Sequence, residues 1–270
     1  MPSVRKILKR MLVLVTVFYI LICAALYFFQ EKLIFFPAKL TTGYQFNFSQ
    51  PFEEHFIITN SGKKLNGILF KADSSKGLLF YLHGNAGAVD SWGEIAKTYT
   101  DLNYDIFILD YPGYGKSEGK INGEKKLFDD IQDVYNDLLK RYKEDKVVII
   151  GYSIGTGPAA KLASNNHPRL LILQAPYYSL TDMMRHTYSI IPTFLLKYKF
   201  NTSEYLKDCK MPVVVFHGKQ DEVIYYGSSL KLQKEMKSLD TLITLANQGH
   251  NGMSENSEYV DALSKMLAEK

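Results

Sequence analysis

The chain has 270 residues, of which 46% are hydrophobic and 13% aromatic, and its formal net charge is only +4. This size allows one large α/β domain of about 235 residues after an N-terminal segment. The lysines are scattered and no arginine-rich patch alternates with aromatic residues, so the sequence gives no support for nucleic-acid binding. No C-x-x-C, H-E-x-x-H or EF-hand pattern occurs, so no metal site is predicted. Cys23 lies in the N-terminal apolar segment and Cys209 lies far along the chain in a predicted loop. No disulfide between them is therefore expected.

The N-terminus combines a basic flank with a long apolar run. The uncharged residues 11–29 follow four basic residues, Arg5, Lys6, Lys9 and Arg10. About 19 residues at 1.5 Å each give close to 30 Å of helix, which matches the core of a bilayer. The run therefore predicts a single-pass anchor in a lipid bilayer. The basic flank predicts a cytoplasmic N-terminus, with the rest of the chain on the non-cytoplasmic side.

Two other interpretations of this segment are less favoured. A cleaved signal peptide has a shorter apolar core and small residues at its cleavage site, whereas bulky residues follow Cys23-Ala24-Ala25. A buried core helix would need a polar face, which this run lacks. We therefore divide the chain into residues 1–35, a cytoplasmic tail, transmembrane anchor and linker, and residues 36–270, the globular domain.

Beyond the anchor, short buried-strand patterns alternate with helical patterns. Two runs, at 56–58 and 65–70, flank the turn signal Asn60-Ser61-Gly62 and predict a hairpin. Further strands are predicted at 78–82, 105–109, 147–150, 170–173, 213–216 and 241–245. Helices are predicted at 127–142, 155–165, 227–239 and 254–268. This alternation predicts βαβ units with right-handed crossovers and a mostly parallel sheet flanked by helices.

The pentapeptide Gly151-Tyr152-Ser153-Ile154-Gly155 joins the strand at 147–150 to the next helix. A G-x-S-x-G turn between a strand and a helix is typical of a nucleophile elbow, which exposes the serine hydroxyl above the strand end. The pentapeptide therefore predicts Ser153 as a nucleophile. Taken alone, it also fits an ordinary strand-to-helix turn with a capping serine.

A serine hydroxyl is a weak nucleophile and needs a general base, which in turn needs an orienting carboxylate. Asp221 follows the strand at 213–216, and His250 follows the strand at 241–245. Because the carboxyl ends of parallel strands meet at one edge of a sheet, Ser153, Asp221 and His250 are expected to converge there. Glu222 is a weaker rival for Asp221, and His250 would otherwise cap a turn.

The oxyanion of the reaction needs fixed N–H donors. One is expected to be the backbone N–H of Ile154, and the other that of Asn85, with Ala86 as the near alternative. His83 is expected to support this loop through hydrogen bonds. His217 is expected to pack under the loop of Asp221 without a catalytic role.

Five segments together resemble the α/β-hydrolase superfamily: His83-Gly-Asn-Ala-Gly, Asp110-Tyr-Pro-Gly-Tyr-Gly-Lys-Ser, Gly151-Tyr-Ser-Ile-Gly, His217-Gly-Lys-Gln-Asp221 and Gly249-His-Asn. The resemblance covers roughly residues 30–270 and is greatest to the N-terminally membrane-anchored subgroup, which includes lipid and acyl-protein hydrolases. It implies an α/β-hydrolase fold with Ser153, Asp221 and His250 as the triad and Asn85 and Ile154 as oxyanion donors. It also implies ester or thioester hydrolysis through an acyl-enzyme, without a cofactor.

The apolar stretch at 177–210 departs from the pattern of the superfamily and predicts a small lid, although ordinary helices packing on the sheet are the alternative. An anchor and an apolar lid together favour lipid or acylated substrates and a role in lipid metabolism. A serine peptidase or amidase on the same fold is one alternative function. A catalytically silent membrane scaffold is the other, although it would not need a complete triad.

Overall fold

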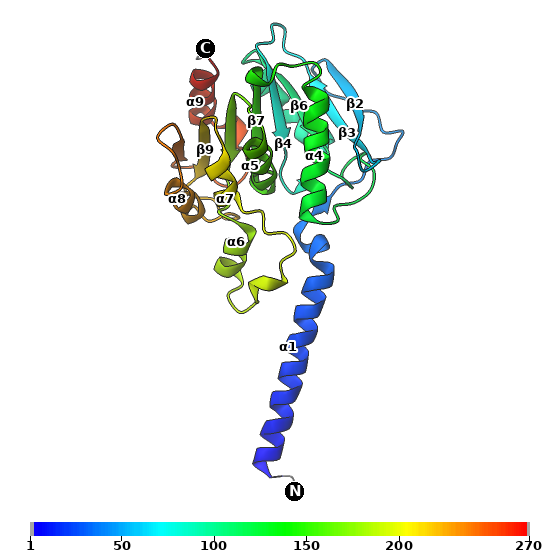
Figure 1. Cartoon of the computed structure of the whole chain (residues 1–270), viewed down its shortest axis with the longest axis vertical. Helices are drawn as coiled ribbons and strands as arrows, with labels where there is room; N and C mark the ends of the chain where they lie inside the picture. The colour runs from blue at the N-terminus through cyan, green and yellow to red at the C-terminus, as the bar shows by residue number, and fades with distance from the viewer. Residues whose placement is uncertain (1–2, 269–270) are drawn as a thin grey trace.

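The computed structural model describes residues 3–268 and shows one long helix, α1 (Val4–Ile34), projecting from a globular part (Figure 1). The outermost residues of the two predicted domains, 1–2 and 269–270, lie outside the described residues. The most apolar stretch of α1 is not buried by the rest of the chain. This helix is longer than the predicted apolar run, because the basic flank and residues 30–34 are also helical. Residues 31–34, which we predicted as part of a linker, therefore belong to α1.

An eight-stranded sheet in the order β10-β9-β8-β7-β4-β6-β3-β2 forms the centre of the globular part. The two antiparallel pairs are β2 with β3 and β3 with β6, and the other neighbours are parallel. The strands are β2 (Phe52–Ile58), β3 (Lys64–Phe70), β4 (Leu78–Leu82), β6 (Asp105–Leu109), β7 (Val147–Tyr152), β8 (Leu170–Gln174), β9 (Val213–Gly218) and β10 (Thr241–Leu245). The predicted hairpin and the mostly parallel sheet are both confirmed.

Helices cover both faces of this sheet. One face packs against α4 (Glu124–Leu138), α5 (Thr156–Asn165), α7 (Thr202–Asp208) and α8 (Gly227–Gln233). The other packs against α2 (Val89–Trp92), α3 (Ala96–Thr100) and α9 (Ser257–Ala268). In β4, Leu78, Phe80 and Leu82 face the first layer and Leu79 and Tyr81 the second, because successive side chains point to opposite faces of a sheet.

Several helices differ from their predicted bounds. The one predicted at 127–142 is α4, which begins at Glu124 and ends at Leu138, and the one predicted at 227–239 ends at Gln233. The last helix begins at Ser257, after a 3₁₀ turn at Met253–Glu255. Neither α2 nor α3 was predicted, because elements of one turn are too short to show a helical period.

The junction between α1 and the globular part is short. A single residue, Phe35, separates the end of α1 from β1 (Phe36–Pro37). Its side chain is buried against the rings of Tyr198 and Phe200. The two-residue strand β1 pairs in parallel with β5 (Ala86–Gly87), which lies in the loop after β4. Helix α1 is therefore joined directly to the part of the fold that carries Asn85.

The predicted lid at 177–210 contains two different parts. The helix α7 packs in the core through Leu206, as the alternative interpretation expected. The helix α6 (Leu180–Thr187) and the residues after it extend away from the sheet toward α1 (Figure 1). We call residues 180–196 the α6 segment.

Candidate active site

The turn after β7 places Ser153 above the carboxyl end of the sheet. Ser153 has a φ of +52°, in the left-handed region that non-glycine residues seldom adopt. It begins a 3₁₀ turn, Ser153–Gly155, which leads into α5. A Cβ added at Gly155 would lie 2.1 Å from the carbonyl oxygen of Leu82, and one at Gly151 would lie 2.6 Å from that of Gly155. Only glycine fits at these two positions, so the motif keeps tight the turn that places Ser153 at the wall of a cavity.

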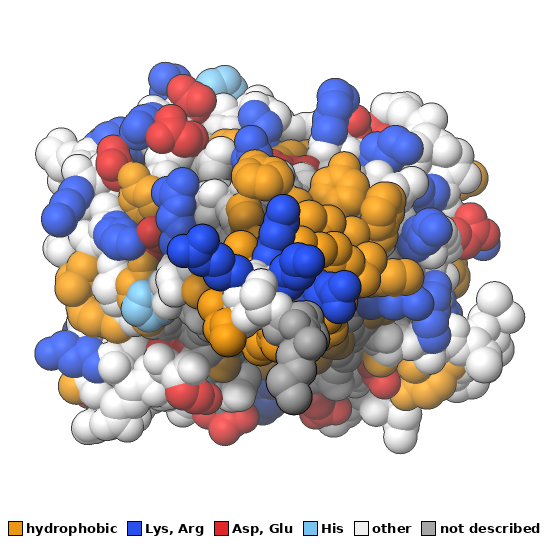
Figure 2. Space-filling model, turned by 90° about the horizontal axis from the view of Figure 1, so that it is seen from below, with side chains coloured by type: hydrophobic (Ala, Val, Ile, Leu, Met, Phe, Trp, Pro, Cys, Tyr) orange, Lys and Arg blue, Asp and Glu red, His pale blue; other side chains and the backbone are white. Residues whose placement is uncertain are grey.

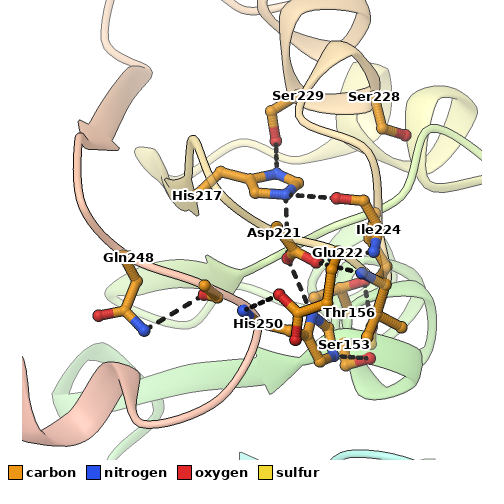
Figure 3. A network of polar contacts seen from close by, with 12 residues as sticks. Ser153, Thr156, His217, Asp221, Glu222, Ile224, Ser228, Ser229, Gln248 and His250 are labelled. Carbon is orange, nitrogen blue, oxygen red and sulfur yellow. Dashed lines mark hydrogen bonds and ion pairs between the residues drawn. The ribbon is translucent and has the colours of Figure 1, made fainter.

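The three residues of the predicted triad meet at this edge (Figure 3). The loop after β9 carries Asp221, and the loop after β10 carries His250. His250 Nε2 lies 3.0 Å from Ser153 Oγ, and His250 Nδ1 lies 2.8 Å from Asp221 Oδ2. Because the Asp221 carboxylate accepts the hydrogen on Nδ1, Nε2 is free to accept the serine proton. The arrangement is that of a nucleophile, a base and an orienting acid.

The carboxylate of Asp221 is held by four contacts. Its Oδ1 accepts hydrogen bonds from the backbone N–H groups of Val223 and Ile224, at 2.9 and 2.8 Å. Its Oδ2 faces His250 Nδ1 and also lies 3.2 Å from His217 Nε2. Burial by itself raises the pKa of Asp221, but the hydrogen bonds from His217, His250 and the Ile224 N–H, together with the charge interaction with His250, hold this pKa below its usual value. The acid is therefore ionised at neutral pH.

His217 is the residue whose importance the sequence analysis missed. Its ring is fully buried at the end of β9, with Nδ1 2.6 Å from Ser229 Oγ and Nε2 2.9 Å from the carbonyl oxygen of Ile224. Because a carbonyl oxygen only accepts, Nε2 carries the hydrogen, which also points at Asp221. His217 thus positions the carboxylate of Asp221. Its place four residues before Asp221 is the only sequence feature that pointed to this contact.

The rival acid, Glu222, occupies a different place. Its Oε2 accepts a hydrogen bond from the backbone N–H of His250 at 3.3 Å, instead of one from the imidazole ring. Glu222 therefore supports the loop of His250, while Asp221 contacts the ring itself.

Asn85 and Ile154, the predicted oxyanion donors, line one cavity of about 380 Å³ together with Ser153 and His250. Ile154 is the second residue of its 3₁₀ turn, where the backbone N–H has no partner within the turn. The Asn85 loop is fixed from outside. Tyr114 Oη donates to the Asn85 carbonyl at 2.8 Å, and the N–H of Phe36 donates to Asn85 Oδ1 at 3.2 Å.

His83 lies fully buried beneath this loop, as expected of a supporting residue. Its Nδ1 lies 2.7 Å from the carbonyl oxygen of Gly84, and Tyr111 Oη donates to the carbonyl oxygen of His83 at 2.8 Å. Trp92 Nε1 donates to the carbonyl of Ala86 at 2.8 Å, which fixes the far end of the loop. Among residues 3–268, no group of three or more His, Cys, Asp or Glu side chains is placed to hold a metal ion.

Comparisons with known proteins identify the family to which this fold belongs. A family model described as the alpha/beta hydrolase fold matches residues 77–198. Alpha/beta hydrolase domain-containing protein 17B of Xenopus laevis is 32% identical over 203 residues, which are 73% of this chain and 68% of that protein. This chain belongs to the α/β-hydrolase family. The human protein of the same name is 30% identical to this hydrolase over 219 residues, which are 78% of this chain and 74% of the human one.

Solved structures share the fold of this hydrolase. The esterase Pf2001 of Pyrococcus furiosus superposes with a TM-score of 0.67 at 18% identity, covering 87% of this chain and 96% of that one. An alpha-beta hydrolase of Vibrio vulnificus gives a TM-score of 0.68 at 19% identity, covering 79% and 80%. At these identities the likeness concerns the fold alone.

Proposed function

We propose that this α/β-hydrolase cleaves carboxylic esters or thioesters of lipid or acylated substrates through an acyl-enzyme on Ser153. The observation that carries the proposal is the chain of contacts from Ser153 Oγ to His250 Nε2, at 3.0 Å, and from His250 Nδ1 to Asp221, at 2.8 Å. A histidine that is oriented by a carboxylate and bonded to a serine can remove the serine proton as the oxygen attacks.

The proposed reaction has two halves. Ser153 Oγ attacks the acyl carbon while His250 Nε2 takes its proton, and the N–H groups of Ile154 and Asn85 stabilise the oxyanion. Collapse of this intermediate breaks the bond to the alcohol or thiol, which leaves with the proton from His250. Water then attacks the acyl-enzyme with the same base, so the acid is released and Ser153 recovers its proton.

The walls of the cavity support an acyl substrate. Beside the polar groups they include Leu180, Met183 and Val223, which give an apolar surface next to Ser153. Ligand sites are commonly apolar with a few placed polar groups that fix orientation. An acyl chain fits such walls better than a charged or strongly polar substrate does.

The test is a substrate panel run on the full chain in detergent. It contains p-nitrophenyl esters, acyl-CoAs and monoacylglycerols, with a p-nitroanilide of the same acyl chain as the amide control. We expect ester or thioester turnover to exceed anilide turnover by at least about 100-fold, and a fluorophosphonate probe to label Ser153. Faster anilide turnover would support a peptidase or amidase. Folded protein that neither reacts with the probe nor turns over any substrate would contradict the proposal.

We also propose that α1 is an uncleaved anchor with its N-terminus in the cytoplasm and the hydrolase domain on the other side. Most of the uncharged residues 11–29 of α1 are exposed to the surroundings of the protein, and the basic residues precede them. Positively charged flanks remain on the cytoplasmic side of membranes.

Cysteine labelling tests this orientation. In sealed spheroplasts, a membrane-impermeant maleimide is expected to label Lys125→Cys, on the exposed surface of α4, and to label Ser3→Cys only after lysis. Both variants should retain the mass of the full chain. Labelling of Ser3→Cys before lysis would reverse the orientation, and loss of the first 20 to 30 residues would identify a cleaved signal peptide.

A further inference from the structure

A second apolar cavity, of about 630 Å³, lies between α1 and the α6 segment. Leu26, Leu33 and Ile34 of α1 form one wall, and Met184, Ile191 and Leu196 form the opposite wall. We call this cavity the anchor groove. It brings together two parts of the chain that lie about 150 residues apart in the sequence.

The anchor groove adjoins the cavity at Ser153. Four residues line both cavities: Ile154, Leu180, Met183 and Val223. One of them, Ile154, directly follows Ser153 and supplies a proposed oxyanion donor. The two cavities therefore lie side by side and share an apolar wall, which extends from Ser153 toward the side of α1.

Polar contacts hold the two walls of the groove together. Gln30 is buried, and its Nε2 donates to the carbonyl of Leu195 at 3.1 Å, while its Oε1 accepts from the N–H of Lys197 at 2.8 Å. Nearer the N-terminus of α1, Tyr19 Oη donates to the carbonyl of Ile190 at 2.8 Å. Among the described residues, Gln30 is the one amide side chain in the lining of the groove, and both its Nε2 and its Oε1 have hydrogen-bond partners in the chain.

The tip of the α6 segment lies at the depth of the proposed membrane span. Tyr19 is near the middle of residues 11–29, so its partner Ile190 also lies within that layer. Residues 187–196 carry no charge, and the side chains of Ile190 and Phe194 are 80% and 81% exposed. In the view from below, hydrophobic side chains gather next to a group of basic ones near the centre of the molecule (Figure 2). Such a patch marks a membrane-facing surface.

We propose that the anchor groove holds the acyl chain of a long-chain substrate that remains embedded in the bilayer while its carbonyl carbon reaches Ser153. The proposal rests on the ester or thioester hydrolysis proposed above and specifies its substrate class. The lining is apolar, it opens beside the membrane span, and it adjoins the cavity of the nucleophile. An acyl chain that follows this apolar wall does not cross water, where each exposed methylene group would oppose its transfer.

The experiment compares p-nitrophenyl palmitate with p-nitrophenyl butyrate on the full chain in phosphatidylcholine nanodiscs. We expect kcat/KM of the wild type to be at least tenfold higher for palmitate. Met184→Trp and Leu26→Trp fill the groove from opposite walls and are expected to lower palmitate turnover at least tenfold, with butyrate changed less than twofold. Leu21→Trp, on a lipid-exposed part of α1 outside the groove, is the matched control and should change neither ester.

The outcomes separate this proposal from the proposed function. A wild type that prefers butyrate overturns the groove, whatever the variants do. Tryptophan variants that label normally with a fluorophosphonate but keep full palmitate turnover, or lose both esters equally, also overturn it. A wild type that hydrolyses neither ester contradicts the hydrolytic function itself.

Discussion

Replacing Ser153 with alanine is expected to lower kcat for ester hydrolysis by about 10⁴- to 10⁶-fold, because the variant has no oxygen to form the acyl-enzyme. Fluorophosphonate labelling should disappear at the same time. The turnover that remains would come from water activated by His250 and from the oxyanion donors. Steady-state kinetics on p-nitrophenyl esters measure the loss, and thermal unfolding of both proteins shows whether the fold is intact.

Ser164→Ala is the matched control for this change, since Ser164 lies near the end of α5 and donates to the carbonyl of Lys161. It removes one serine hydroxyl from the same helix and strand unit and should retain wild-type kcat. If Ser153→Ala kept more than a tenth of the activity, another residue would have to be the nucleophile.

Replacing Asp221 with asparagine should lower kcat by about 10⁴-fold, because the new side chain favours the wrong tautomer of His250. The oxygen of the amide would keep the backbone N–H groups of Val223 and Ile224. Its NH₂ would then face His250 Nδ1, which must accept this hydrogen bond. The ring proton would move to Nε2, and Nε2 could no longer take the proton of Ser153. Kinetics with p-nitrophenyl esters measure the loss.

Glu222→Gln tests the neighbouring carboxylate in the same way. Among residues 3–268, the carboxylate of Glu222 bonds to the backbone N–H of His250 and not to its ring, so we expect a loss of less than about tenfold, in line with a peripheral hydrogen bond. If Glu222→Gln cost more than Asp221→Asn, the assignment of the acid would have to be reversed.

The same Asp221 variant has a predictable effect on acid stability. The pKa of Asp221 is lower in the folded protein than in the unfolded chain, since burial is outweighed by the hydrogen bonds from His217, His250 and the Ile224 N–H, together with the charge interaction with His250. Such a carboxylate stabilises the fold above its unfolded pKa of about 3.9, and this stabilisation is lost as the pH falls toward the folded value. The stability difference between wild type and Asp221→Asn should therefore be constant from pH 6 to 8 and shrink below about pH 4. Urea unfolding across this range measures it.

The strands of the sheet were predictable because each central strand is buried on both faces. Such strands read as continuous apolar runs, and the bounds predicted at 78–82 and 105–109 are those of β4 and β6. The pairing of β1 with β5 could not be predicted, because strands of two residues have no period. Helix ends were less predictable, since α8 ends at Gln233 although Met236, beyond its end, still packs against the core.

Placement of the three triad residues could be predicted from chain order and from their positions after buried strands. The second partner of Asp221 could not, because the sequence does not show which ring atom of His217 faces the carboxylate. The anchor groove was also beyond prediction. It depends on α1 lying against the α6 segment, and the contacts from Tyr19 and Gln30 that place them together join backbone groups far along the chain.

The single residue between α1 and β1 has a mechanical consequence. With only Phe35 separating the helix from a strand that pairs beside Asn85, no flexible linker separates α1 from the part of the fold that carries Ser153. An α1 that spans a bilayer would hold Ser153 at one constant height above the lipid. The protein would then select scissile bonds by their distance from the membrane surface. Scissile bonds presented at that height would be cut, and chemically identical bonds held a few nanometres farther out would be left intact.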